Sequence, residues 1–382
     1  THMRITHIKS EASSIGVRHS AMVHWEETGW PTNELSFSID DQPAGMCEAN
    51  AFLAGLYPLA VLHGERRIEM AEPVCPMLVD GLATIHAWWR SWGLADGEAP
   101  VVEAPAEHRA VEGSTTATVF LSGGVDSVHM LLLNRRRFSP GDPGYARDAV
   151  FLHGFDIGKH KKTGPETSYF GLALDHVRPI ATELGVRLVT ASTDLRHLPT
   201  AEGFWSKQFH GACLAAAAHA VTRGPSLVLI AATFDVANMS TWGSHPIVDP
   251  NYSTQRVRIV HECARYSRLQ KVRDLAAFDV ALDHLRVCQT NPEDRLNCGK
   301  CEKCLRTRLE LFVAGVPFAG ALGDTLPDVA LVAAQVEVHD RYTASCYRDL
   351  AAPLRALQQT SRADVLAEKV TNFERATPVA TG

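Results

Sequence analysis

Hydrophobic and polar positions change rhythm once along the chain. Residues 3–93 contain short alternating runs and longer apolar stretches. A period of two predicts half-buried strands, and longer apolar stretches predict packed helices. The expected strands and helices of this region are 21–26, 34–39 and 66–70 as strands, with 48–63 and 77–92 as helices. This pattern is typical of a small α+β domain.

From residue 116 onward, strand patterns alternate with helix patterns. The expected strands are 116–121, 149–155, 186–190 and 226–233, and the expected helices are 126–137, 167–184 and 204–221. Such alternation predicts an α/β fold in which helices cover both faces of a parallel sheet. Ligands of such sheets bind at the carboxyl ends of the strands.

We therefore expect four segments. An N-terminal domain at 3–93 is followed by a linker at 94–115 that is rich in Ala, Pro, Glu and Gly. The α/β domain occupies 116–315, and 316–382 form a helical extension. The N-terminal domain is also a candidate surface for a protein partner.

Composition narrows the function classes. The chain has 382 residues, 46% of them hydrophobic, and a net charge of −6. This is ample for a packed core, whereas an acidic balance does not favour nucleic acid as a partner. The sequence contains no run of 18 apolar residues, so we expect no membrane span. The start lacks a signal-peptide pattern. We expect a cytoplasmic protein.

The first strand of the α/β region leads directly into a glycine turn. Residues 122–127 read Ser-Gly-Gly-Val-Asp-Ser, and a helix pattern follows. Two glycines allow backbone N–H groups to close around an anion, and a helix N-terminus favours phosphate. The spacing matches neither a Walker loop nor the dinucleotide fingerprint. The alternative is a glycine turn that binds nothing. The candidate phosphate-binding residues are Ser122, Gly123, Gly124, Val125, Asp126 and Ser127.

Four cysteines form a second pattern. Cys288, Cys298, Cys301 and Cys304 are spaced C-x9-C-x2-C-x2-C within 288–304. Four thiolates at tetrahedral corners suit Zn²⁺, and a site with four protein ligands is structural. Reduced buried cysteines, disulfides and an iron–sulfur cluster are the alternatives. The five other cysteines have no matching partners and are expected to pack.

Together, the 122–127 loop and the 288–304 knuckle resemble those of 7-cyano-7-deazaguanine synthases, in the PP-loop ATP pyrophosphatase superfamily. The resemblance covers about half of the chain. It implies an adenine nucleotide alpha hydrolase-like sandwich with structural zinc. It also implies an ATP-dependent ligase that adenylates a carboxylate. The family's substrate is 7-carboxy-7-deazaguanine, and ammonia converts it to the nitrile.

The resemblance also suggests roles outside the loop. Phe155 and Asp156 match the stretch where the adenosine end of ATP lies, and Ser267 matches a helix N-cap. Segments 205–211 and 240–250 depart from the family, and 3–93 have no counterpart in the compact enzyme. The chain is thus similar to the longer deazaguanine-synthase-like proteins of bacterial antiviral gene clusters. Its carboxylate substrate and its amine, ammonia or a protein amine, stay open.

A mechanism follows from this assignment. Ser122, Gly123, Gly124 and Ser127 would donate to the β- and γ-phosphates. Asp126 would bind Mg²⁺ or orient the loop, because a carboxylate repels phosphate. Lys159 or Lys207 would offset charge on the leaving pyrophosphate, unless both are ordinary surface lysines.

The segment after the fourth strand is expected to line the pocket for the carboxylate substrate. Trp242 would stack on a flat base, with Gly243 and Ser244 beside it, and Asp249 would pair with ring N–H groups. His210 or His245 would serve as a general base toward an amine. An ordinary Pro/Gly loop and structural histidines are the alternatives.

Two other functions compete with this one. A tRNA-modifying PP-loop enzyme of the thiolation or lysidine type would use 3–93 to recruit RNA. Thiolation needs reactive cysteines near the ATP loop, whereas the clustered cysteines are expected to bind metal. The acidic net charge also does not favour RNA. A nucleotide-binding partner protein without turnover is the third function, and the intact Asp126 argues against it.

Overall fold

A computed structural model describes residues 2–26, 29–43, 45, 49–108, 111–157, 165–316, 320–323 and 325–377. Within these ranges ten strands form one sheet. The strands are β1 (Met3–Ala12), β2 (Gly16–His24), β3 (Asn33–Asp40), β4 (Arg67–Met70), β5 (Val101–Glu103), β6 (Thr116–Phe120), β7 (Ala146–His153), β8 (Arg187–Thr193), β9 (Ser226–Ala231) and β10 (Val257–Glu262).

The strand order is β10-β9-β6-β7-β8-β3-β2-β1-β4-β5. Strands β10 to β8 are parallel, β8 to β1 are antiparallel neighbours, and β4 and β5 run parallel to β1. The fold is therefore α/β with a large, mostly parallel sheet. Strand β3 pairs with β8, with Phe37 opposite Thr193 and Ile39 opposite Ala191. The region 3–93 thus adds its strands to the sheet of the 116–315 region.

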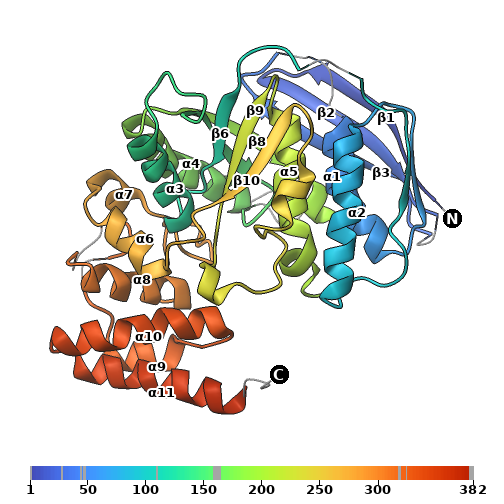
Figure 1. Cartoon of the computed structure of the whole chain (residues 1–382). Coiled ribbons are helices and arrows are strands. Elements are labelled where there is room, and N and C mark those ends of the chain that lie inside the picture. Colours follow the sequence, from blue (N-terminus) through green and yellow to red (C-terminus); the bar gives the residue numbers. More distant parts are fainter. Residues whose placement is uncertain are drawn as a thin grey trace.

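Helices cover the sheet on two faces (Figure 1). One face carries α1 (Ala49–Leu62), α2 (Pro76–Ser91) and α5 (His210–Val221). The opposite face of the parallel part carries α3 (Val125–Arg137), α4 (Pro165–Glu183), α6 (Arg268–Leu275), α7 (Asp279–His284) and α8 (Glu302–Val313). Each face has its own buried apolar core, as expected of a parallel sheet.

The C-terminal helices form a separate layer next to α6 and α8 (Figure 1). They are α9 (Val329–Gln335), α10 (Arg341–Ala356) and α11 (Thr360–Ala376). Leu269 of α6 and Leu305 and Leu309 of α8 belong to the same buried cluster as Tyr347 and Leu366 of these helices. The extension is therefore packed against the layer that follows the parallel sheet.

Short helical turns complete the chain. They are η1 (Leu195–His197), the π-helix η2 (Trp205–Phe209), η3 (Val236–Asn238) and η4 (Asp249–Tyr252). The sequence predicted one helix over 204–221, whereas its first turn is the π-helix. π-Helical turns are rare in proteins, and those that occur often lie at functional sites.

Most expected elements are present, and three strands were missed. β1 alternates in burial only near its start, at Met3 and Ile5, so its period-two signal is weak. β5 lies inside the predicted 94–115 linker and pairs with β4. β10 follows a Pro-rich loop and was not predicted. The boundary between the two predicted domains stays a prediction. One sheet and one apolar core contain residues from both sides of it.

Among the helices that the structure describes, none is long and apolar enough to cross a membrane.

Candidate functional site

The 122–127 loop joins the carboxyl end of β6 to the start of α3. Gly123 has φ +75°, and a Cβ there would approach Val177 to 2.9 Å, so glycine is required. Ser127 Oγ donates to the Gly124 carbonyl at 3.1 Å and accepts from the Ser122 N–H at 3.2 Å. The loop is thus held tight by its own hydroxyls.

The other loop positions fit the same arrangement. Gly124 is the N-cap of α3, and its N–H lies 3.3 Å from Ser122 Oγ. Val125 begins the helix and is buried in the core. Ser122 is exposed. An exposed hydroxyl beside a helix N-terminus is a suitable donor set for an anion.

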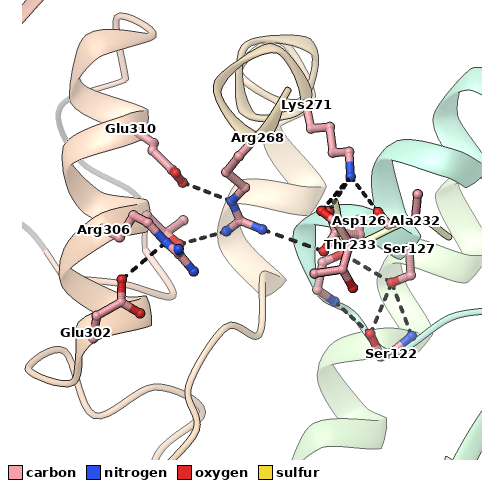
Figure 2. Close-up of polar contacts among 12 residues, drawn as sticks. Ser122, Asp126, Ser127, Ala232, Thr233, Arg268, Lys271, Glu302, Arg306 and Glu310 are labelled. Carbon is pink, nitrogen blue, oxygen red and sulfur yellow. Dashed lines mark hydrogen bonds and ion pairs between the residues drawn. The ribbon is translucent and has the colours of Figure 1, made fainter. Parts of the chain in front are cut away.

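Asp126 is bound by two cations of α6. Lys271, fully buried, places Nζ 2.7 Å from Asp126 Oδ1 and 2.5 Å from the Ala232 carbonyl after β9 (Figure 2). Arg268 lies 3.8 Å from Oδ2. Burial opposes ionisation of Asp126, but the two cations outweigh it and hold its pKa below the usual value. Of its two predicted roles, these contacts correspond to orienting the loop.

A buried ion-pair network continues from Arg268 into α8 (Figure 2). Arg268 Nε donates to Glu310 at 3.1 Å, and Arg306 lies 3.4 Å from Glu302 one turn earlier. Burial raises the pKa of Glu310, although Arg268 and Arg306 act to lower it. Breaking one member of such a network leaves an uncompensated buried charge, which is costly.

Further cations lie near the loop. The backbone N–H of Arg286 donates to the Gly123 carbonyl at 2.9 Å. The side-chain Nε of Arg286 lies 3.4 Å from the Ser122 carbonyl. Lys303 lies in the first turn of α8. Burial among neighbouring groups lowers the pKa of Lys303, and Asp156 and Asp126 act to raise it. These cations create a positive field at the carboxyl end of β6, which suits a polyphosphate.

The four predicted cysteines come together in space. Their sulfur atoms all lie within 4.8 Å of one another. The nearest pair, Cys301 and Cys304, is 3.5 Å apart, and the pairs Cys288–Cys301 and Cys298–Cys304 are 4.0 Å apart. Tetrahedral Zn²⁺ with bonds of about 2.3 Å sets sulfurs roughly 3.8 Å apart. The cluster can therefore hold a metal ion such as zinc, and these separations are too long for disulfides.

The cysteine cluster also positions the loop. Asn297, which is buried, accepts from the Val287 and Cys288 N–H groups at 2.9 and 3.1 Å. Its amide donates to the Leu285 carbonyl at 2.8 Å. Arg286 lies within this clamped segment, so the knuckle holds the backbone that contacts Gly123.

A second group of residues lies beyond the end of β7. Phe155 contacts Trp205 of the π-helix with ring centroids 5.4 Å apart. Arg196 stacks 3.8 Å above Trp205, donates to the Phe155 carbonyl at 2.6 Å, and lies 3.7 Å from Asp156. Asp156 is exposed, and its carbonyl accepts from Asn291. The predicted adenosine-side residues are therefore linked to the π-helix by an arginine.

The predicted pocket residues for the carboxylate substrate are only partly brought together. Trp242 packs 5.6 Å from the His210 ring. Gly243 lies against α5, because a Cβ at Gly211 would come within 2.0 Å of its carbonyl. Burial lowers the pKa of His210, so its imidazole is neutral at pH 7. Trp242 and His210 are suitably placed for a flat ligand.

Asp249 has a different environment from the one expected. It is fully buried, and its oxygens accept from Ser244 Oγ at 2.7 Å, the His245 N–H at 3.2 Å and His261 Nδ1 at 2.7 Å. These contacts occupy its carboxylate, so it faces protein groups. His245 Nδ1 accepts from the Ile247 N–H, and burial lowers the pKa of this imidazole.

The two candidate lysines differ in status. Lys207 is exposed on the π-helix, next to the aromatic group around Trp205. Lys159 lies outside the described residues. Among the described residues, the cations that contact the 122–127 loop are Lys271, Arg268 and Arg286, and Lys207 is not one of them.

Sequence reasoning did not assign a site role to Lys271, Arg268, Arg286, Arg196 or His261. The N-cap prediction at Ser267 is confirmed, with a capping box to Gln270, and it was the available signal for the adjacent Arg268 and Lys271. Arg286 precedes the first knuckle cysteine by two positions. Arg196 and His261 belong to no recognised motif, and they meet Trp205 and Asp249 only after the chain folds back.

Comparisons with known proteins leave the class to be defined by the structure. No family model matches the chain, and searches of curated proteins and of solved structures find no match. Fold and site define an α/β protein with a mostly parallel sheet and a four-cysteine cluster able to hold a metal ion.

Proposed function

We propose that this protein is an ATP-dependent ligase. It would adenylate a carboxylate of the deazapurine class and then let an amine displace AMP, as in the PP-loop family that its two motifs resemble. The observation that carries the proposal is the 122–127 loop. It is tightly turned, begins a helix, and is surrounded by Lys271, Arg268, Arg286 and Lys303.

The chain's own groups would hold the triphosphate at this loop. Ser122 Oγ is exposed, and Gly124 places a backbone N–H at the helix start. Gly123 carries no side chain, and a Cβ there would clash with Val177. The loop backbone can therefore approach an anion closely. Asp126 would act through Lys271 and Arg268, keeping both cations aligned with the loop. Positive charge here would stabilise the leaving pyrophosphate.

Two metals fit this proposal in different ways. Mg²⁺, when bound with ATP, would neutralise phosphate charge; Asp156 is the exposed carboxylate near the loop cations. A structural Zn²⁺ at the four cysteines would hold the knuckle closed. Asn297 and Arg286 would transmit that closure to Gly123.

The carboxylate substrate would lie near the aromatic groups beyond β7 and β9. Trp242 and Trp205 flank His210, with ring centroids 5.6 and 6.0 Å from it. Trp92 packs 5.2 Å from the His245 ring. Flat, partly apolar surfaces favour a planar heterocyclic acid over an aliphatic one.

The proposal is tested by carboxylate-dependent exchange of labelled pyrophosphate into ATP. We expect exchange with 7-carboxy-7-deazaguanine and Mg²⁺, and AMP release on adding ammonium chloride. Free lysine in place of ammonia tests a protein amine, and mass spectrometry distinguishes amide from nitrile. Absence of both exchange and AMP with this acid would contradict the proposal.

A matched pair of serine variants ties the activity to the loop. Ser127→Ala removes the hydroxyl that links Ser122 to Gly124, and we expect exchange to fall at least tenfold. Ser91→Ala removes a hydroxyl that bonds the Trp88 carbonyl on the exposed end of α2, and should leave exchange unchanged. Equal rates in the two variants would show that the loop does not bind ATP.

A further inference from the structure

A buried polar trio at the end of β10 has no part in the loop chemistry. Ser244, Asp249 and His261 meet there, with the carboxylate fully buried and the His261 side chain 4% exposed. Asp249 Oδ2 accepts from His261 Nδ1 at 2.7 Å and from Ser244 Oγ at 2.7 Å. The other oxygen accepts from the His245 N–H.

These contacts assign the tautomer of His261. A carboxylate accepts only, so Nδ1 carries the proton and Nε2 carries the lone pair. Both hydrogen-bond contacts of the His261 side chain within the described residues are made by Nδ1, and Nε2 makes none. Nε2 is therefore the ring nitrogen that no described protein group occupies. A buried carboxylate that accepts from Nδ1 fixes the tautomer and the orientation of the imidazole ring.

The trio lies at the same edge of the sheet as the phosphate loop. His261 pairs with Ile230 of β9, and the next residue, Glu262, accepts from the Ala232 N–H at 2.8 Å. The Ala232 carbonyl binds Lys271, which binds Asp126. Strand β10 is two strands from β6, about 10 Å at the usual spacing. Parallel strands that end at one edge of a sheet place their following groups along that edge, where ligands of such sheets bind.

Two other histidines lie nearby and are less suited to be the base. His245 accepts from a backbone N–H at Nδ1, so its Nε2 is a donor. His210 Nδ1 donates to the Trp205 carbonyl at 3.2 Å, which provides no negative charge, and burial lowers its pKa. Only His261 combines a carboxylate partner with an open Nε2 among these three described histidines.

We propose that His261 is the general base for the amine step of the proposed ligase, with Asp249 and Ser244 as positioning residues. The nitrogen lone pair attacks the acyl carbon of the adenylate, and a C–N bond forms. The C–O bond to AMP breaks, and AMP leaves with the electron pair. The excess proton on nitrogen passes to His261 Nε2 and then to water. This inference rests on the proposed function.

The test separates the two half-reactions. His261→Gln should keep carboxylate-dependent pyrophosphate exchange within threefold, while ammonia-dependent product formation falls about 100-fold in kcat. Imidazole added to His261→Ala should restore part of the product rate, which a purely structural role would not allow. His339→Gln, an exposed histidine of the C-terminal region, is the matched control and should leave both rates unchanged.

A spectroscopic measurement tests the geometry without any activity. Labelled histidine spectra of the full chain should show the Nδ1 of His261 protonated and hydrogen-bonded, and Ser244→Ala should preserve this. An Nε2–H tautomer would overturn the assignment.

The two proposals fail in distinguishable ways. Equal losses of exchange and product in His261→Gln overturn the role of His261 while leaving the ligase intact. Absence of exchange in the unaltered protein overturns the ligase and, with it, this role.

Discussion

The two halves of the candidate site are built differently. The phosphate half consists of six consecutive residues, 122–127, braced by buried ion pairs from α6 and α8. The half proposed to face the carboxylate substrate is assembled from separate segments: the π-helix, the loop after β9, β10 and the end of α2. One half is a local motif with long-range support, and the other exists only through long-range packing.

Among the described residues, the N-terminal region and the start of the linker contact the half proposed to face the carboxylate substrate. Trp92 contacts His245, and Gln208 donates to the Leu94 carbonyl at 3.1 Å. The core under this half joins residues of α1 and α2 with Phe209 and Tyr252. The phosphate half instead lies on the core formed with α3, α4 and α6. In the proposed ligase, the residues that would bind ATP are thus separated from the surfaces that would select the acid.

Loss of the cysteine cluster should produce the largest effect and should fall on the phosphate half. Cys301→Ser opens the knuckle, and we expect unfolding free energy to drop by about 4 kcal/mol or more, because a lost metal is among the costliest changes. Urea unfolding and metal analysis check this, with one zinc per chain expected before the change. Cys213→Ala, a buried cysteine outside the cluster, should keep the metal. Equal metal content in both variants contradicts the site.

Removing the Asp126 carboxylate comes next. Asp126→Asn leaves the buried Lys271 ammonium unpaired, which should cost about 3 kcal/mol and lower exchange about 100-fold. Adding Lys271→Met should recover stability and not exchange, because the buried charge is gone but the loop is still unsupported. Recovery of exchange in the double variant would mean that Asp126 serves stability alone.

Acid should weaken the half that faces the carboxylate substrate through His219 of α5. This buried imidazole, which donates to the Tyr252 carbonyl, has its pKa lowered by burial to about 4. Below about pH 6.5 the unfolded chain binds a proton at this imidazole that the folded chain does not bind. The free energy of unfolding therefore decreases as the pH is lowered to about 4. The loss should reach about 2 kcal/mol at pH 5, measured by urea unfolding. His219→Gln keeps a donor and should remove this part of the slope; an unchanged slope would falsify it.

The smallest effect tests the contribution of the N-terminal region. Trp92→Ala removes the ring next to His245, worth roughly 1 kcal/mol, so KM for the acid should rise about fivefold. KM for ATP should stay unchanged, because the phosphate half does not contact this helix. Trp88→Ala, an exposed tryptophan one turn earlier, is the control. A change in KM for ATP would remove the distinction between the halves.

Local features were predictable because their causes are local. The run 116–121 is apolar and β-branched, two glycines follow, and good helix formers come next, so strand, turn and helix needed no distant partner. Ser267 was expected as an N-cap through the resemblance, and the cap itself is local, because Ser267 bonds Gln270 three residues later. The four cysteines were predictable because a metal imposes its spacing on the chain.

Contacts between distant segments were not predictable in the same way. Asp249 looked like a ligand group in its loop, yet its loop folds back so that His261, on a strand that was not predicted, occupies it. Strand β3 carries no mark that it will pair with β8, because any strand edge offers the same N–H and C=O groups.

The amino-acid order alone was sufficient for the loop, the knuckle and the alternation of strands and helices, since these depend on neighbours within a few residues. Folding in three dimensions decided which cations meet Asp126, which base Asp249 orients and where the N-terminal strands join the sheet. The contacts of Asp126 and the pairing of β3 with β8 join residues more than a hundred positions apart, and His261 meets Asp249 only because the chain folds back between them.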